Sequence, residues 1–300
     1  MPNLDQLQVF IAVVDEGGFG AAARKLNRAV SAISYAISNL EAQVGLVLLK
    51  REGSRKPVLT EAGQTILADA RLIAADLQAL RARALGMHSG LEPEVSVALD
   101  VMIPLDRVAG LLREFQETYP TVNLRLHVEA LGGVAALLLD GRAQLGISGP
   151  AITDHPDLER ADAGELMLVP VAAPDHPLVR AGELPAGAAR AHLQLVLTDR
   201  SNLTEGRDFT VASPRTWRLA DLGAKFELLR EGIGWGNMPL GMIEEDLEKG
   251  RLVRLKMADD IGGPYRLTAL WRRDDPPGPA TKWLLGALAS ALAPQKRRQA

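Results

Sequence analysis

The chain has 300 residues, of which 47% are hydrophobic and 24% charged, and it contains no cysteine. This composition excludes a largely disordered chain, and the missing cysteines exclude disulfide frameworks, thiol nucleophiles and cysteine metal sites. The first ten residues lack the basic start and apolar run of a signal peptide, and no apolar span of about 18 residues follows. We therefore expect a cytoplasmic protein of two or three domains with no membrane segment.

Charge is unevenly distributed along the chain. The net charge is −3, but residues 1–60 carry seven basic and five acidic side chains, so this segment has +2 and the remainder −5. Because phosphate groups attract basic surfaces, the first sixty residues are the expected place for contact with nucleic acid.

Those sixty residues show three short helical patterns followed by two short strand patterns. The apolar residues at helical spacing are Leu7, Phe10, Ile11 and Val14, then Phe19, Ala22, Ala23 and Leu26, then Ile33, Ala36, Ile37 and Leu40. The segment LNRAVS has the length of the tight turn in a helix-turn-helix. The segment VLLKREGSRKPVLT predicts a β-wing, in which Arg51, Arg55 and Lys56 are candidates for phosphate contact.

The third helix carries an unusual polar face. Ser31, Ser34, Tyr35 and Ser38 stand where an exposed helix normally has Lys and Glu. Compact hydrogen-bonding groups suit base edges in the major groove, so these four residues and Val30 are the candidate base contacts. The alternative is that the serines are ordinary solvated positions; the preceding helices and the basic wing favour the DNA interpretation.

Together, the segments FIAVVDEGGFGAAARKL, SAISYAISNLE and LTEAG resemble the winged helix-turn-helix of LysR-type transcriptional regulators. The resemblance implies double-stranded promoter DNA as a partner. Members commonly have Gln where this chain has Val30, and often Arg where it has Tyr35. Val30 can contact a thymine methyl but cannot make a bidentate contact with a base. Ala29 replaces the usual polar cap, so we expect Asn27 or water to satisfy the free N–H groups at the helix start.

A long helix is expected after Thr60, a candidate N-cap. The next 28 residues contain no proline, and apolar residues recur alternately four and three positions apart, at Ile66, Ala70, Ile73, Leu77, Leu80, Ala84 and Met87. Such a heptad seam calls for a partner helix, and a homodimer would predict a pseudo-palindromic DNA site. Packing against the chain's own body is the alternative. The resemblance implies dimerisation through this helix and a homotetramer.

Beyond residue 90, strand and helix patterns alternate, which predicts an α/β sheet. Strands are expected at 95–99, 122–128, 143–149, 166–173 and 193–197, and a helix at 104–120. The segments FQETYPTVNLRL, LLLDGRAQLGIS, LLREGIGWGNMP and LEKGRLVRL resemble the two-lobed LysR-type effector domain, which is akin to periplasmic binding proteins, although members usually have Asp where Gln144 stands. The expected fold is α/β overall, with a winged helix-turn-helix at 1–60, a dimerising linker helix and hinge at 61–90 and a two-lobed effector domain at 91–300.

Ligands of open α/β sheets bind beyond the carboxyl ends of strands. The candidate effector-binding residues from this rule are Asp100, Val101, Met102, Ser148, Thr198 and Asp199, with Trp217 and Asn237 closing the cleft. As alternatives, Trp217 belongs to a lobe core and Ser148 caps a helix. A carboxylate at Asp100 disfavours an anionic effector unless an arginine, such as Arg200, Arg215 or Arg218, offsets it.

No motif for catalysis is present. The glycines of GIGWG follow a helix and precede a strand, the reverse of a dinucleotide fingerprint, and LGISGP lacks the nucleophile elbow. The five histidines lack ligand-like spacing, so we expect them on the surface, with no metal site, cofactor or enzyme activity. The sequence predicts a ligand-responsive regulator that binds promoter DNA and a small-molecule effector, with RNA polymerase as a further expected partner. The alternative is a small-molecule binding protein whose N-terminal module serves assembly.

Overall fold

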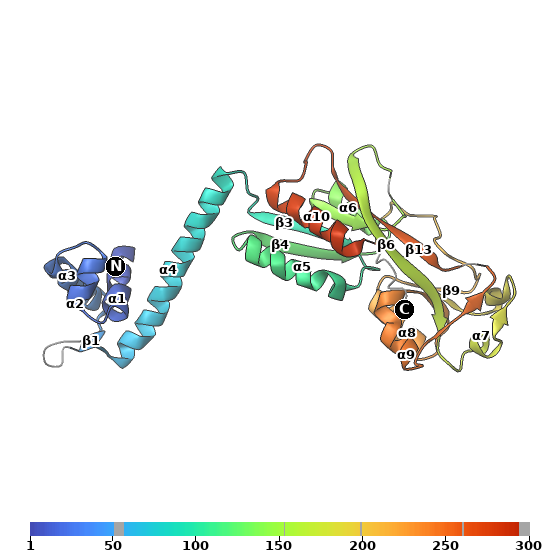
Figure 1. Ribbon diagram of the computed structural model, residues 1–300, viewed down its shortest axis with the longest axis horizontal. Coiled ribbons are helices and arrows are strands. Elements are labelled where there is room, and N and C mark those ends of the chain that lie inside the picture. Colours follow the sequence, from blue (N-terminus) through green and yellow to red (C-terminus); the bar gives the residue numbers. More distant parts are fainter. Residues whose placement is uncertain (51–56, 153, 199, 260, 294–300) are drawn as a thin grey trace, which may run out of the picture. The chain divides into compact units, whose positions relative to one another are not determined.

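The computed structural model describes residues 1–50, 57–152, 154–198, 200–259 and 261–293. The chain divides into two compact units, residues 1–85 and 86–300 (Figure 1). Most of helix α4 (Glu61–His88) belongs to the first unit and its last turn to the second. In these described ranges, every helix is too short or too polar to cross a membrane.

The first unit is the expected winged helix-turn-helix. Its elements before α4 are α1 (Leu4–Asp15), α2 (Phe19–Lys25), α3 (Val30–Val44), β1 (Leu49–Lys50) and β2 (Val58–Leu59). The predicted apolar stripes meet in one core, in which Phe10, Ala22 and Ile33 are fully buried. Strands β1 and β2 pair antiparallel as the base of the wing. Arg51, Arg55 and Lys56, the expected phosphate contacts, lie outside the described residues.

Polar contacts fix the base of the wing against α3 and α4. The Glu41 carboxylate accepts hydrogen bonds from the backbone N–H groups of Leu48 and Leu49, at 2.7 and 3.1 Å. Thr60 is confirmed as the cap of α4, because its hydroxyl oxygen accepts from the N–H of Gly63 at 2.8 Å. A Cβ atom at Gly63 would lie 2.1 Å from the carbonyl oxygen of Leu48, so only glycine lets the wing approach α4 this closely.

The predicted seam of α4 divides into two parts. Leu67 and Ala70 of its first half are buried in the core of the first unit, so this half packs on its own body. Farther along, Ile73, Leu80 and Met87 are exposed, Leu80 at 61%. Leu67 is a core residue that the heptad pattern did not include. The apolar surface available to a partner helix is therefore the second half of α4.

The second unit is built on one mixed sheet whose strands follow the order β4-β3-β5-β13-β6-β10-β8-β9, with β11 paired to β6. These strands are β3 (Glu94–Asp100), β4 (Asn123–Glu129), β5 (Leu145–Ser148), β6 (Leu158–Ala172), β8 (Gln194–Leu197), β9 (Thr216–Leu219), β10 (Trp235–Pro239), β11 (Val253–Arg254) and β13 (Gly263–Arg272). A second small sheet pairs β7 (Glu183–Leu184) with β12 (Lys256–Met257). The helices are α5 (Leu105–Thr118), α6 (Gly133–Leu139), α7 (Pro177–Arg180), the 3-10 helix η1 (Ala188–Ala191), α8 (Leu222–Arg230), α9 (Leu240–Glu248) and α10 (Pro279–Leu292).

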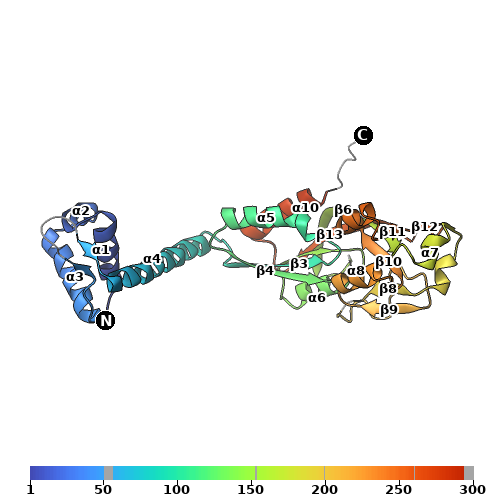
Figure 2. The ribbon, with the colours of Figure 1, turned by 90° about the horizontal axis from the view of Figure 1, so that it is seen from below.

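Two lobes result from this strand order. Parallel strands β4, β3 and β5 form one lobe, and β10, β8 and β9 form the other. The long antiparallel strands β6 and β13 run through both lobes and join them. In the first lobe α5 and α10 cover one face of the sheet and α6 the other (Figure 2). The expected two-lobed α/β fold is confirmed.

Strand β6 is longer than expected, and Gln144 occupies a position where Asp is usual. We expected a strand at 166–173, but β6 begins at Leu158, because its first half pairs with β13 over a stretch that mixes charged and apolar residues and so hides the period of a buried strand. The family's usual Asp is replaced by Gln144, whose side-chain oxygen accepts from the N–H of Ser96 at 2.9 Å. The uncharged amide of Gln144 therefore links the residue before β5 to strand β3.

Candidate functional site

One face of α3 presents the residues that we expected to contact DNA. Val30 and Tyr35 are 52% and 70% exposed, and Ser31 and Ser38 are also exposed. Ser34 is half-buried. The opposite stripe of the same helix is buried in the core. The fold thus presents a small, nearly uncharged strip of side chains on the second helix of the helix-turn-helix.

Of the two alternatives expected at the start of α3, the cap by Asn27 is not formed. Ala29 occupies the cap position and no side chain caps the helix. Asn27 lies in the turn with a left-handed φ of 51°, so its role is conformational, because Asn tolerates this region better than most residues. The first N–H groups of α3 are therefore left to water or to another molecule.

Several basic side chains near α3 are held in ion pairs. Arg28 lies 2.7 Å from Asp5, and this contact lowers the pKa of the Asp5 carboxyl. Lys25 pairs with Glu16 at 2.5 Å. Lys50, exposed at the end of β1, is a further basic residue on the wing that the sequence reasoning did not include.

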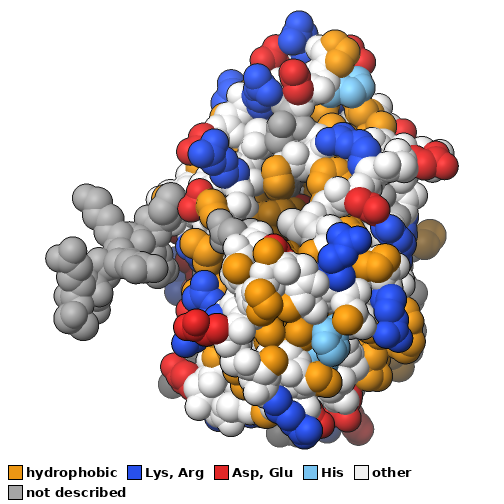
Figure 3. All heavy atoms as spheres, turned by 90° about the vertical axis from the view of Figure 1, so that its right-hand side faces the viewer, with side chains coloured by type: hydrophobic (Ala, Val, Ile, Leu, Met, Phe, Trp, Pro, Cys, Tyr) orange, Lys and Arg blue, Asp and Glu red, His pale blue; other side chains and the backbone are white. Residues whose placement is uncertain are grey.

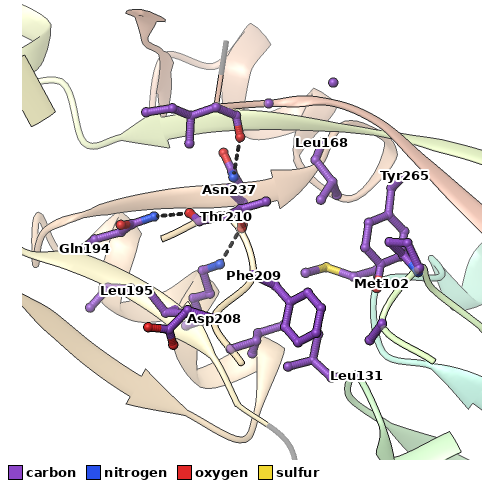
Figure 4. A pocket seen from close by; sticks show the side chains of 18 of the residues that line it. Met102, Leu131, Leu168, Gln194, Leu195, Asp208, Phe209, Thr210, Asn237 and Tyr265 are labelled. Carbon is purple, nitrogen blue, oxygen red and sulfur yellow. Dashed lines mark hydrogen bonds between the residues drawn. The ribbon is translucent and has the colours of Figure 1, made fainter. Parts of the chain in front are cut away.

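The second unit contains a cavity of about 290 Å³ between its lobes. Its wall is mostly apolar, and Met102, Leu131, Phe209 and Tyr265 gather on one side of it (Figure 4). This volume lies at the small end of the range for sites that bind small organic molecules. A second cavity of about 480 Å³ adjoins the first and shares Leu131 and Phe209 with it.

Two buried amides organise the polar side of the cavity. The side chain of Gln194, on β8, donates to the carbonyl of Thr210 at 2.8 Å and accepts from the N–H of Ala212 at 2.8 Å. It thereby holds the loop that carries Phe209. Asn237, on β10, donates to the carbonyl of Ile261 at 2.8 Å. Within the described part of the chain, the side-chain oxygen of Asn237 is buried and accepts no hydrogen bond.

Asp100 lies behind the cavity wall rather than in it. Its carboxylate accepts hydrogen bonds from the N–H of Met102 at 2.9 Å, the N–H of Gly149 at 3.1 Å and the hydroxyl of Tyr265 at 2.9 Å. Burial raises the pKa of Asp100 to about 6 although these three donors act against the increase. A Cβ atom at Gly149 would lie 1.9 Å from the Tyr265 hydroxyl oxygen, so glycine is required there. Asp100 therefore positions Met102 and Tyr265.

Lys225 is an ionisable group that the sequence reasoning missed. It lies on α8 and lines the cavity, yet it is only 3% exposed. Its ammonium donates to the backbone carbonyl of Asn237 at 2.7 Å. Burial lowers the pKa of Lys225 to about 7, since the charged form loses its hydration.

The other candidate effector residues are scattered. Met102 and Asn237 line the cavity, and Thr198 lines the adjoining one. Ser148 is buried, with its hydroxyl donating to the carbonyl of Gly149, so it does not cap a helix. Trp217 is 51% exposed and lines neither cavity, so it is not a lobe-core residue either. Val101 lines neither cavity, and Asp199 lies outside the described residues.

The expectation of surface histidines was wrong for His176. This residue is buried and its Nδ1 accepts from the N–H of Leu178 at 3.2 Å, so it caps α7. Its ring lies 5.4 Å from that of His192, and burial lowers the pKa of His176.

On the face of the molecule drawn in Figure 3, Lys and Arg side chains are mixed with Asp and Glu rather than collected into a field of one sign. A winged helix-turn-helix and a two-lobed unit with an apolar cavity between its lobes define a DNA-binding regulator with a small-molecule site. Comparisons with known proteins agree. Residues 4–64 match the family described as bacterial regulatory helix-turn-helix protein, lysR family, and residues 88–293 match the LysR substrate binding domain. The chain belongs to the LysR family of transcriptional regulators and is not an enzyme.

Relatives match over nearly the whole chain. The HTH-type transcriptional regulator AceR of Acinetobacter baumannii is 26% identical over 94% of this chain and 95% of its own length. Among solved structures, a mutant of OxyR from Corynebacterium glutamicum has a TM-score of 0.56 and 22% identity, covering 97% of this chain and 93% of that one. Full-length LysG of the same organism, solved with bound effector Arg, has a TM-score of 0.52 and 22% identity over 97% and 100%. The two structures support the fold.

Proposed function

We propose that the chain is a homodimeric regulator that binds pseudo-palindromic promoter DNA with α3 and the wing, and that a small molecule in the interlobe cavity changes its DNA binding. The observation that carries the proposal is the pairing of an exposed polar strip on α3 with a mostly apolar cavity between the lobes of the second unit. Acting on chromosomal DNA places the protein in the cytoplasm. Two dimers associate as a tetramer, and RNA polymerase is the contact through which bound protein affects transcription.

In this proposal Val30, Ser31, Ser34, Tyr35 and Ser38 contact base edges, and Arg51, Arg55 and Lys56 contact phosphates. Tyr35 supplies a hydroxyl and an apolar ring, and Val30 a methyl surface for thymine. Regulation is a shift of population. An effector that binds one arrangement of the lobes more tightly than another changes the separation of the two DNA-binding units, and thus their fit to the two half-sites.

Fluorescence anisotropy tests the DNA part of the proposal. The full chain is titrated onto DNA from upstream of its own gene and onto a shuffled copy, across a series of salt concentrations. We expect affinity that depends on sequence and weakens steeply with salt. Tyr35→Ala should reduce the preference for the promoter by roughly 1–3 kcal/mol, the usual value of a base contact. Gln43→Ala, an exposed change at the other end of α3, is the matched control.

Equal losses on both DNAs for Tyr35→Ala would remove the base-reading role, and equal weak binding of the wild-type chain to both would remove promoter recognition. The runner-up function, a small-molecule binding protein with an N-terminal assembly module, predicts this second result. The match of residues 4–64 to a regulatory helix-turn-helix family argues against it.

The dimer is tested on the exposed half of α4. Leu80→Gln places a polar amide in the proposed helix seam, whereas Gln78→Ala changes an exposed neighbour outside that seam. Sedimentation equilibrium should give a dimer dissociation constant raised roughly tenfold or more by Leu80→Gln, because a buried leucine contributes about 1.5–3 kcal/mol. An unchanged constant, with folding intact, would place the dimer interface elsewhere.

A further inference from the structure

The interlobe cavity contains a buried lysine for which the described residues provide no anionic partner. Lys225 is almost fully buried, and loss of hydration is the one cause that acts on its protonation. A protonated lysine has three N–H donors, and a single hydrogen bond, to the carbonyl of Asn237, is formed within the described ranges. Buried charges in proteins are ordinarily paired, so the arrangement calls for an anion.

Two acidic groups near the cavity, Asp208 and Asp100, already have partners. Asp208 lines its outer part and forms an ion pair with Arg218 at 2.7 Å. Asp100 is behind the wall and accepts hydrogen bonds from three donors, including Tyr265. Its carboxylate therefore faces protein donors behind the wall and is not among the groups that line the cavity.

The local backbone is built to admit the lysine. Gly236 lies next to it, and a Cβ atom there would be 3.0 Å from Lys225 Cε and 2.7 Å from the carbonyl oxygen of Leu195. Glycine at this position leaves room for the lysine side chain between α8 and the sheet. The absence of a side chain at Gly236 thus leaves space for Lys225, whose amino group lies beside the carbonyl of Asn237.

A second unmet polar group lies on the same residue that Lys225 contacts. The side-chain oxygen of Asn237 is buried and, among the described residues, has no hydrogen-bond donor. The rest of the wall includes Met102, Leu131, Leu195, Phe209, Ile261 and Pro264. A matching molecule has one negative charge, a hydrogen-bond donor near it and an otherwise apolar body.

The adjoining cavity also favours a negatively charged ligand. Its lining includes Arg200, Arg207 and Arg218 against the two carboxylates Glu205 and Asp208. Arg207 also lies over the ring of Phe209, which lines both cavities, with 5.1 Å between the guanidinium carbon and the ring centre. A positive excess at the outer end of a cavity raises the local concentration of anions.

We propose that the effector is a small organic acid with an apolar body, whose carboxylate pairs with Lys225. This inference rests on the proposed function, since it names the class of molecule that the interlobe cavity senses. The donor that would reach the side-chain oxygen of Asn237 is a hydroxyl group near the carboxylate.

The test is calorimetric titration of the full chain with three probes of one shape: mandelate, phenylacetate and the neutral phenylacetamide. We expect at least one of the two acids to bind roughly tenfold or more tightly than the amide, the usual advantage of a charge-assisted hydrogen bond. Lys225→Met should remove the preference for acid over amide, and Lys225→Gln, which keeps a donor but no charge, should remove it too. Lys282→Met, at an exposed position of α10, should leave it unchanged.

The proposal is overturned if neither acid binds, if the amide binds as tightly as the acids, or if the acid preference survives in a folded Lys225 variant. Failure of the proposed function has a different signature. Acids would then bind through Lys225 while the wild-type chain showed no sequence-dependent affinity for promoter DNA in the anisotropy assay.

Discussion

Replacing Lys225 by methionine should stabilise the second unit near neutral pH. The pKa of this lysine falls from 10.5 to about 7 in the folded chain because burial penalises its charge. One pKa unit corresponds to about 1.4 kcal/mol, so the penalty amounts to about 5 kcal/mol in order of magnitude. Loss of the hydrogen bond to the carbonyl of Asn237 offsets about 1–2 kcal/mol of this, which leaves a net gain of roughly 3 kcal/mol for Lys225→Met.

The sign of the pH dependence follows from the two protonation states. The unfolded chain binds a proton at residue 225 below about pH 10.5, whereas the folded chain does so only below about pH 7. Between these values the unfolded state holds more protons, so the stability of the wild-type chain rises with pH by up to about 1.4 kcal/mol per unit. The advantage of Lys225→Met should be full at pH 7 and below and nearly absent at pH 10.5.

Tryptophan fluorescence isolates the relevant unit, because all four tryptophans of the chain lie beyond residue 86. Urea unfolding of the wild-type chain, Lys225→Met and the exposed control Lys282→Met is followed from pH 6 to 10. Tyr265 and the Asp208–Arg218 pair contribute equally to the pH dependence of both chains, so their contributions cancel in the difference between the wild-type and variant stabilities. A wild-type chain as stable as Lys225→Met at pH 7, or a difference that does not change with pH, would refute the reasoning.

Two further predictions concern packing and the hydrogen bonds behind the cavity. Gly63→Ala should destabilise the first unit by about 1–3 kcal/mol and weaken DNA binding, because its Cβ atom would meet the Leu48 carbonyl; Gly110→Ala, in a helix with open space around it, should be neutral or stabilising by thermal unfolding. Tyr265→Phe removes one donor to the Asp100 carboxylate, so the pKa of Asp100 should rise above about 6. The variant should then lose roughly 1–2 kcal/mol at pH 7 and less at pH 5, and equal losses at both pH values would contradict this explanation.

The DNA-binding unit was predictable because its signals are local. Helical periodicity marked Ile33, Ile37 and Leu40 as one buried stripe, so the polar residues of the same helix were expected on the other face. Thr60 predicted the start of α4, because threonine is a common N-cap residue. The splitting of the α4 seam was not predictable, since one apolar pattern serves both packing on the unit's own core and packing on another chain.

The cavity was harder to predict because its wall comes from segments far apart in the chain. Residues 194–197, 208–210 and 261–265 meet only after the lobes have folded, and strand-end reasoning reached just Met102 and Asn237 of this wall. One signal was available for Lys225. It stands three residues after Leu222 and four before Leu229, both buried, so it occupies the apolar stripe of α8. A lysine in such a stripe is unusual enough to mark a site.

Two buried groups that cost this unit stability are associated with the cavity: Lys225 lines it, and Asp100 lies behind its wall. Lys225 and Asp100 are both buried, and burial moves both pKa values toward neutral pH, one downward and one upward. Lys225 is not needed for packing, since a methionine would fill its space among the apolar residues that build the rest of the wall. An anion that pairs with Lys225 would restore part of the lost electrostatic energy only in the arrangement of lobes that brings it to the ammonium group. The unpaired Lys225 lowers the stability of the free chain, and an anion that pairs with it can recover part of this free energy in one arrangement of the lobes. The anion then binds that arrangement more tightly than another, which is what a ligand-driven population shift requires.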